Sequence, residues 1–342
     1  YLFFLVTFAI NFTVIYCGVK GCIERLCKIA MPLLFLFAVI LAVRVLTLAP
    51  PDAGHPERNL SNGLGFLWNP DFAALKDARV WLAASGQVLF TLSVGIGVII
   101  TYASYLSKGD DIVLSGLTAA SLNEFAEIVL GGTIVIPLAF MFFGGTGARE
   151  VAASGSFNIG FVAMPLVFAQ MTGGGFFAFI WFLLLFLAGI TSSVSLLEPA
   201  VAFLSDDLGI ARKRTVKWLA LITFVLCQFP IFFLARGVVD EVDFWAGTFF
   251  LVVFALCESL IFIWVYGIDQ AWDEMHHGAE LRIPRIYRVI IKYVTPLFLL
   301  AVLGFWLVQQ AVPTFLLRGV PRENVPYVLG TRLAPLVLFG AI

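Results

Sequence analysis

Residues 86–97 read GQVLFTLSVGIG, which departs from the continuous apolar pattern of a helix buried in lipid. It lies inside an apolar window of helix length at about residues 83–106. Glycines recur along it, and Gln87, Thr91 and Ser93 bring hydrogen-bonding groups near mid-membrane depth. A helix interrupted inside a bilayer frees carbonyls that can hold a cation and amides that can meet a carboxylate. The alternative is close helix packing through small residues. The polar neighbours favour an unwound helix at a binding site.

A second polar stretch, AGITSS at residues 188–193, interrupts another apolar window. Ala188, Thr191 and Ser192 stand at positions i, i+3 and i+4, so a backbone carbonyl and two hydroxyls can converge on one helix face. Uncharged oxygen ligands suit a hard monovalent cation better than a transition metal. Serine and threonine in membrane helices also bond back to carbonyls of their own helix, and this alternative stays open.

A third signal is Asn123, followed one turn later by Glu127, at the entrance of an apolar window that we place at residues 125–145. An acid at membrane depth is expensive and is by default a functional hypothesis. The alternative is an interfacial carboxylate that faces water. The start of this helix decides between the two interpretations.

The composition of the whole chain places it in a membrane. Of its 342 residues 61% are hydrophobic and only 13% are charged, which is too little polar material to cover a water-soluble protein of this size. Apolar windows of helix length lie at roughly residues 1–17, 29–49, 83–106, 125–145, 175–204, 215–235, 242–267, 289–312 and 329–342. We therefore expect an all-α polytopic membrane protein.

The charged residues orient the chain and exclude other classes of function. Lys and Arg are denser in the connections on one side, which the positive-inside rule places in the cytoplasm together with residues 18–28. The net charge is −1 and no basic face gathers, which excludes nucleic acid as a partner. The sequence has no hydrolase elbow, P-loop or zinc motif, so we expect no enzyme. Segments 50–79 and 146–173 then lie outside, and we expect partly ordered lids there.

Several strings in the chain resemble the neurotransmitter:sodium symporter family. GQVLFTLSVGIGVIITYASYL resembles its unwound sixth helix, LNEFAEIVLGG its seventh, AGITSSVSLLEP its eighth and VDFWAGT the start of its tenth. The resemblance implies an inverted-repeat transporter fold with discontinuous helices, in one transmembrane domain over residues 1–342 that corresponds to family helices four to twelve. It also implies a sodium-coupled amino-acid symporter that works by alternating access, as a multi-pass protein of the inner (plasma) membrane.

The resemblance assigns two sodium sites. The family holds one ion between its sixth and seventh helices and the substrate carboxylate, which implies Thr91 and Asn123 here. It holds a second ion on the eighth helix, which implies the Ala188 carbonyl and the hydroxyls of Thr191 and Ser192. The bilayer and an amino acid are then the implied partners.

The resemblance also assigns a pocket and gates. The implied substrate pocket comprises Phe90, Thr91, Ser93, Ile96, Ser192 and Leu196, whose apolar members suit a neutral apolar amino acid. The implied gates are Asp243 on the outside and Asp206 with Tyr105 on the inside. Glu127 stands where chloride-dependent members have a small neutral residue beside a chloride ion, which implies transport that needs no chloride.

The chain departs from the family at its ends. It begins at Tyr1 inside an apolar run and stops soon after Arg332, so we expect the family's first three helices to be missing and both terminal spans to be cut short. The first and third helices supply the remaining sodium ligands in the family, so we expect both sites to be incomplete here. Two other functions stay open, a membrane receptor that binds an amino acid without moving it and a proton-driven transporter on the same fold.

Overall fold

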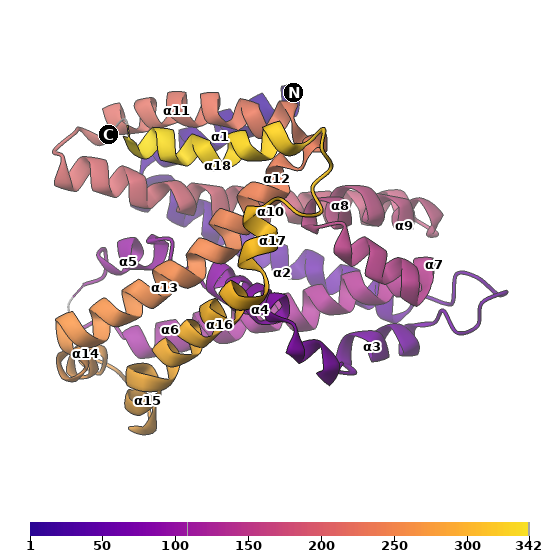
Figure 1. Ribbon diagram of the computed structural model, residues 1–342, viewed down its shortest axis with the longest axis horizontal. Helices are drawn as coiled ribbons and strands as arrows, with labels where there is room; N and C mark the ends of the chain where they lie inside the picture. Colours follow the sequence, from indigo (N-terminus) through magenta and orange to yellow (C-terminus); the bar gives the residue numbers. More distant parts are fainter. Residues whose placement is uncertain (108, 341–342) are drawn as a thin grey trace. The chain divides into compact units, whose positions relative to one another are not determined.

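The computed structural model describes residues 1–107 and 109–340, without the side chains of residue 20 and residues 334–340. Within the described residues the regular structure is helical, with no strand (Figure 1). An all-α membrane fold is therefore confirmed. Several helices continue into short π-helical segments, in which the backbone bonds run from residue i+5 to residue i.

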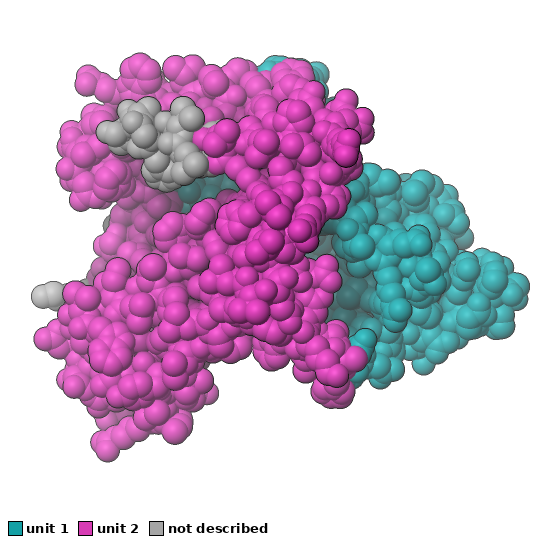
Figure 2. All heavy atoms as spheres, in the orientation of Figure 1, with its two compact units in different colours: residues 1–71, 121–198 teal, residues 72–120, 199–342 magenta. Residues whose placement is uncertain are grey.

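The chain divides into two compact units, each built from separate segments (Figure 2). Unit 1 comprises residues 1–71 and 121–198, and unit 2 comprises residues 72–120 and 199–342. The single transmembrane domain over residues 1–342 stays a prediction.

Unit 1 packs around an apolar core that Leu41, Ile134, Leu138, Val167 and Trp181 help to form. The Trp181 indole, which is buried, donates to the Gly160 carbonyl at 3.1 Å and so has its polar atom satisfied. The helices that lie in this unit or begin there are α1 (Leu2–Cys17), α2 (Glu24–Leu46), α3 (Leu60–Trp68), α7 (Gly132–Ala153), α8 (Ser156–Asn158), α9 (Met164–Gln170) and α10 (Gly174–Ala202). Its π-helical segments are Val19–Ile23, Phe125–Gly131 and Ile159–Ala163.

Unit 2 has its own core, in which Leu82, Val252, Leu299, Val302 and Trp306 are buried. Its helices are α4 (Ala78–Thr91), α5 (Val98–Ala103), α6 (Ile112–Glu124, which ends in unit 1), α11 (Arg212–Phe232), α12 (Val238–Val242), α13 (Phe250–Leu260), α14 (Ile268–Met275), α15 (Ile286–Val289), α16 (Thr295–Gln309), α17 (Ala311–Phe315) and α18 (Val325–Gly340). Its π-helical segments are Phe203–Asp207, Asp243–Phe249, Ile261–Gly267 and Ile290–Val294, and two 3₁₀ turns lie at Phe72–Lys76 and Leu234–Arg236.

The described residues include 6 helices long and apolar enough to cross a membrane. They are Gly21–Leu46, Ile112–Ala153, Gly174–Asp207, Arg212–Phe232, Val238–Met275 and Ile286–Gln309. Each overlaps a predicted window. The windows 1–17 and 83–106 contain shorter helices, because α1 is short and the second window is broken between α4 and α5. The window 329–342 falls on α18, and its residues 341–342 lie outside the described residues.

One helix begins earlier than the sequence predicted. The window 125–145 was placed too late, because α6 begins at Ile112 and continues through a π-helical segment into α7. The Asp111 carboxylate caps this start by accepting from the Leu114 N–H at 2.8 Å, and it also accepts from the Glu280 N–H at 2.7 Å. These two hydrogen bonds hold the pKa of the Asp111 carboxyl below its ordinary value. Asn123 and Glu127 therefore lie well inside a long helix.

Two further predictions concern the connections. Residues 18–28 were expected to connect two spans, but α2 already begins at Glu24 and a π-helical segment precedes it, which shortens the connection. Segments 50–79 and 146–173 were expected to be partly ordered, and this is confirmed by α3, by the end of α7, and by α8 and α9.

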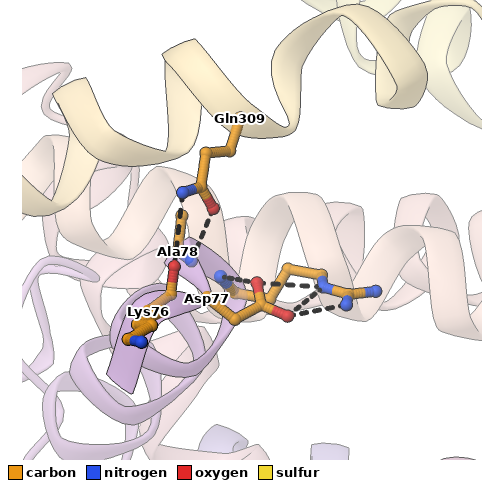
Figure 3. Close-up of polar contacts among 5 residues, drawn as sticks. Lys76, Asp77, Ala78 and Gln309 are labelled. Carbon is orange, nitrogen blue, oxygen red and sulfur yellow. Dashed lines mark hydrogen bonds and ion pairs between the residues drawn. The ribbon is translucent and has the colours of Figure 1, made fainter. Parts of the chain in front are cut away.

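The first turn of α4, the helix that ends at the interruption, is fixed from a distance. The Gln309 side chain at the end of α16 accepts from the Ala78 N–H at 3.0 Å and donates to the Lys76 carbonyl at 3.3 Å (Figure 3). Asp77 caps the same turn by accepting from the Arg79 N–H at 2.9 Å. These bonds satisfy backbone groups that a helix start leaves without a partner.

Candidate functional site

The helix interruption predicted at residues 86–97 is present. Helix α4 ends at Thr91 and α5 begins at Val98 (Figure 1). Between them the Ser93 N–H donates to the Phe90 carbonyl at 3.0 Å and the Val94 N–H donates to the Leu89 carbonyl at 2.8 Å, which closes the helix instead of continuing it. A helix end and a helix start thus meet inside one apolar window, where each leaves backbone groups for a ligand.

Left-handed backbone angles produce the break. Ser93 has φ 58°, Gly95 has φ 81° and Gly97 has φ 75°. Glycine adopts these angles freely, whereas a serine there is strained by roughly 1–2 kcal/mol. Strained non-glycine residues cluster at ligand sites. The glycine pattern predicted the break, but it did not predict the strain at Ser93.

Helix α13 approaches the break closely at Gly95. A Cβ added to Gly95 would lie 2.7 Å from the Leu251 carbonyl oxygen and 3.2 Å from the Ala255 nitrogen. The Gly95 N–H donates to Glu258 Oε2 at 3.1 Å. The break is therefore held by backbone contact and by a carboxylate.

Glu258 is a residue that sequence reasoning missed. It lies in the apolar window 242–267, where an acid is expensive and is a functional hypothesis by default. An acid inside an apolar window is the sequence signal that could have identified Glu258, as it identified Glu127.

The turn Ala188–Ser193 lies within the unbroken helix α10. The Thr191 hydroxyl is buried and donates to the Leu187 carbonyl at 2.9 Å and to the Ala188 carbonyl at 3.1 Å. The Thr191 hydroxyl therefore bonds back to carbonyls of its own helix, as the alternative interpretation of this turn predicted. This bonding does not exclude a cation, because a hydroxyl that donates its hydrogen keeps oxygen lone pairs. The Thr191 hydroxyl oxygen lies 3.1 Å from the Ala188 carbonyl oxygen, and uncharged oxygens are the kind of ligand that a hard cation takes. Ser192 is exposed.

Asn123 and Glu127 flank a change in helix type. Helix α6 ends at Glu124 and a π-helical segment runs over Phe125–Gly131, and such segments are frequent at functional sites. Asn123 Nδ2 is buried and has no hydrogen-bond partner within the described residues. An amide can rotate to present its oxygen instead, so this side chain is available to a ligand of either kind. Glu127 is partly buried.

The acids implied as gates also lie in π-helical segments. Asp206 belongs to Phe203–Asp207 and Asp243 begins Asp243–Phe249. A Cβ on Gly247 would lie 2.9 Å from Asp243 Oδ1, so the carboxylate folds over a glycine. Both acids are exposed. Tyr105 follows α5, and its ring meets the Tyr102 ring edge-on at 6.3 Å.

The residues predicted to line the pocket divide between the two units. Unit 2 contains Phe90, Thr91, Ser93 and Ile96, and unit 1 contains Ser192 and Leu196. The Thr91 hydroxyl donates to the Val88 carbonyl at 3.2 Å. Phe90 and Leu196 are each 43% exposed, so each unit offers apolar surface. The predicted sodium ligands divide likewise, with Thr91 in unit 2 and the others in unit 1.

Comparison with known proteins gives one family. The sequence model of the sodium:neurotransmitter symporter family matches residues 2–322. An uncharacterized sodium-dependent transporter of Methanocaldococcus jannaschii is 30% identical over 288 residues, which cover 83% of this chain and 56% of that protein. The sodium-dependent serotonin transporter of Drosophila melanogaster is 26% identical over 278 residues, which cover 79% of this chain and 43% of that protein.

A solved transporter structure has a similar fold. The crystal structure of MhsT in complex with L-phenylalanine superposes with a TM-score of 0.75 at 30% sequence identity, and the match covers 88% of this chain and 66% of that chain. The match spans between 43% and 66% of the length of these three relatives. The predicted fold, with its discontinuous helices, is therefore confirmed.

Proposed function

Because the chain belongs to the sodium:neurotransmitter symporter family, a family of transporters and not of enzymes, we propose that the protein carrying it moves an amino acid into the cell together with sodium ions. The observation that carries this proposal is the broken helix between Thr91 and Val98. A broken helix leaves backbone groups outside the helical hydrogen-bond pattern, and these suit an amino acid, whose carboxylate can meet N–H groups and whose accompanying cation can meet carbonyls.

Sodium is a co-transported substrate in this proposal. Thr91 and Asn123 would hold one ion, with the carboxylate of the amino acid as a shared ligand. The Ala188 carbonyl, Thr191 and Ser192 would hold the second. The adjacent oxygens on α10 and the buried, unpartnered amide of Asn123 support this assignment.

The amino acid would be neutral and apolar. Phe90, Ile96 and Leu196 would receive its side chain, while Ser93 and Ser192 would lie beside its polar groups. The L-phenylalanine in the MhsT structure supports starting with aromatic and aliphatic amino acids.

Alternating access would use acids as gates, Asp243 on the outside and Asp206 with Tyr105 on the inside. The position of both acids in π-helical segments supports this, since such segments are frequent at functional sites. The protein would lie in the plasma membrane with residues 18–28 facing the cytoplasm. Its apolar helices show an integral membrane protein.

Uptake by proteoliposomes tests the proposal. The full-length protein is reconstituted, and accumulation of labelled phenylalanine and leucine is followed with an inward sodium gradient, with choline in place of sodium, and with a proton gradient alone. We expect accumulation above the outside concentration only with the sodium gradient. Binding without accumulation would indicate a receptor, and accumulation driven by the proton gradient would indicate a proton-coupled transporter.

A further inference from the structure

Helix α1 carries a polar contact that neither the sodium site nor the substrate pocket accounts for. Asn11 Nδ2 donates to the Ser193 hydroxyl of α10 at 2.7 Å, across 182 positions of sequence. Both residues belong to unit 1. Ser193 directly follows Thr191 and Ser192, the residues assigned to the sodium site on α10.

The contact is specific in its bonding. The Ser193 hydroxyl accepts from Asn11 and donates to the Ile190 carbonyl at 3.4 Å, so both of its roles are used. On the other side of the same turn, the Ser195 hydroxyl donates to the Thr191 carbonyl at 3.0 Å. A side chain from another helix therefore holds α10 by a hydrogen bond two residues after Thr191.

Burial of the Asn11 side chain has an energetic cost. Its Oδ1 is buried and has no hydrogen-bond partner within the described residues. A buried acceptor without a partner destabilises a protein, whereas replacing both members of a polar pair by apolar groups of similar shape is nearly neutral or stabilising. Stability alone therefore does not account for an amide in the middle of the apolar helix α1.

We propose that Asn11 is a positioning residue for sodium binding, which holds Ser193 and thereby sets the direction of the Thr191 and Ser192 oxygens. The inference rests on the proposed function, because it takes these oxygens to be sodium ligands. A misplacement of a ligand by a fraction of an ångström weakens a metal site, so loss of this bond should lower sodium affinity and leave the fold intact.

Sodium titrations of substrate binding test the proposal in the full-length protein. Asn11→Leu with Ser193→Ala removes both polar partners, and we expect the half-saturating sodium concentration to rise about fivefold, or about 1 kcal/mol, while the midpoint of thermal unfolding stays equal or rises. The swapped pair, Asn11→Ser with Ser193→Asn, restores an amide–hydroxyl bond and should return the sodium requirement towards that of the parent.

Thr13→Val is the matched control on the same helix, since the Thr13 hydroxyl donates to the Ala9 carbonyl of its own helix at 2.7 Å. It should leave the sodium requirement unchanged. Lower thermal stability with an unchanged sodium requirement would show a structural role and overturn the proposal. Failure of the swapped pair to recover would overturn it as well.

A reference variant separates this inference from the proposed function. Thr191→Val with Ser192→Ala should raise the sodium requirement if the site on α10 exists. If it does and the Asn11 variants do not, only the positioning role is wrong. If neither changes the sodium requirement, the α10 site itself is wrong.

Discussion

The segment Leu92–Gly97 and the turn Ala188–Ser193 both interrupt apolar windows with small and polar residues, yet they fold differently. The first breaks the helix, because Ser93, Gly95 and Gly97 take left-handed angles. The second stays helical, because none of its residues takes a left-handed angle, and the hydroxyls of Thr191 and Ser193 donate to carbonyls of their own helix.

This difference separates two ways of building a polar site in a membrane. A broken helix offers backbone N–H and carbonyl groups and needs glycine and close packing to hold its shape. A continuous helix offers side-chain oxygens and at most a shared carbonyl. The first kind should be sensitive to added volume, and the second to loss of hydroxyls.

The largest expected effect is at Gly95. Gly95→Ala adds a Cβ 2.7 Å from the Leu251 carbonyl oxygen at a left-handed φ, and we expect a loss of roughly 3–5 kcal/mol of stability together with transport. Gly97→Ala is the matched control, because it has a similar φ but its nearest neighbour is the Pro199 side chain at 3.5 Å. It should cost only about 1–2 kcal/mol.

Thermal unfolding followed by size-exclusion chromatography measures both variants. Gly189→Ala extends the comparison to the turn on α10, where a Cβ would meet nothing within 4 Å among the described residues outside its own helix turn. It should be neutral or stabilising by about 0.5–1 kcal/mol. Equal tolerance of alanine at Gly95 and Gly97 would contradict the account of the break.

The second effect concerns Glu127, which lies in the π-helical segment Phe125–Gly131, where the helix continues with a different pattern of backbone hydrogen bonds. A carboxylate near Asn123 can balance sodium charge where an unpaired cation would be costly, so uptake should not need chloride. Glu127→Ser should lower uptake more than about tenfold in gluconate buffer and recover it when chloride is added. Glu124→Ser, at a neighbouring acid, should change neither value.

Two results would refute this role for Glu127. One is wild-type uptake that already collapses in gluconate buffer. The other is a Glu127→Ser variant that remains indifferent to chloride.

The third effect tests the turn on α10. Thr191→Val with Ser192→Ala keeps the side-chain volume nearly constant while it removes two hydroxyls, and the sodium concentration for half-maximal uptake should rise at least tenfold, about 1.4 kcal/mol. The midpoint of thermal unfolding should move little. An unchanged sodium dependence would mean that the hydroxyls serve only their own helix.

The smallest effect is at Ile96, inside the break. Ile96→Ala should enlarge the pocket and shift preference towards bulkier amino acids by up to about tenfold. Competition by a panel of amino acids against a labelled substrate measures the ranking. An unaltered ranking would remove Ile96 from the pocket.

The sequence predicted the features that depend on local chemistry. Apolar windows predicted the helices, the glycines around Ser93 predicted the break, and the spacing of Ala188 and Thr191 predicted oxygens on one face. It misjudged the start of α6, because Ser, Thr and Asn residues along Ile112–Glu124 lower the hydropathy of a helix that Asp111 caps. The aspartate at the cap was the signal that could have placed this start.

The remaining features depend on contacts between distant segments, which no local pattern contains. The bond from Gly95 to Glu258 joins positions 163 residues apart, and the bond from Asn11 to Ser193 joins positions 182 residues apart. The left-handed serine is likewise set by its surroundings, because its own propensity opposes that angle.

The proposed function requires that binding of the amino acid be coupled to binding of sodium. Its most direct test is the dissociation constant of a labelled apolar amino acid for the purified full-length protein, measured across sodium concentrations at constant ionic strength. By linkage, log affinity should rise with log sodium with a slope approaching about 2 for the wild type, and Thr191→Val with Ser192→Ala should move this rise to sodium concentrations at least about tenfold higher. An affinity that does not change with sodium in the wild type would contradict it.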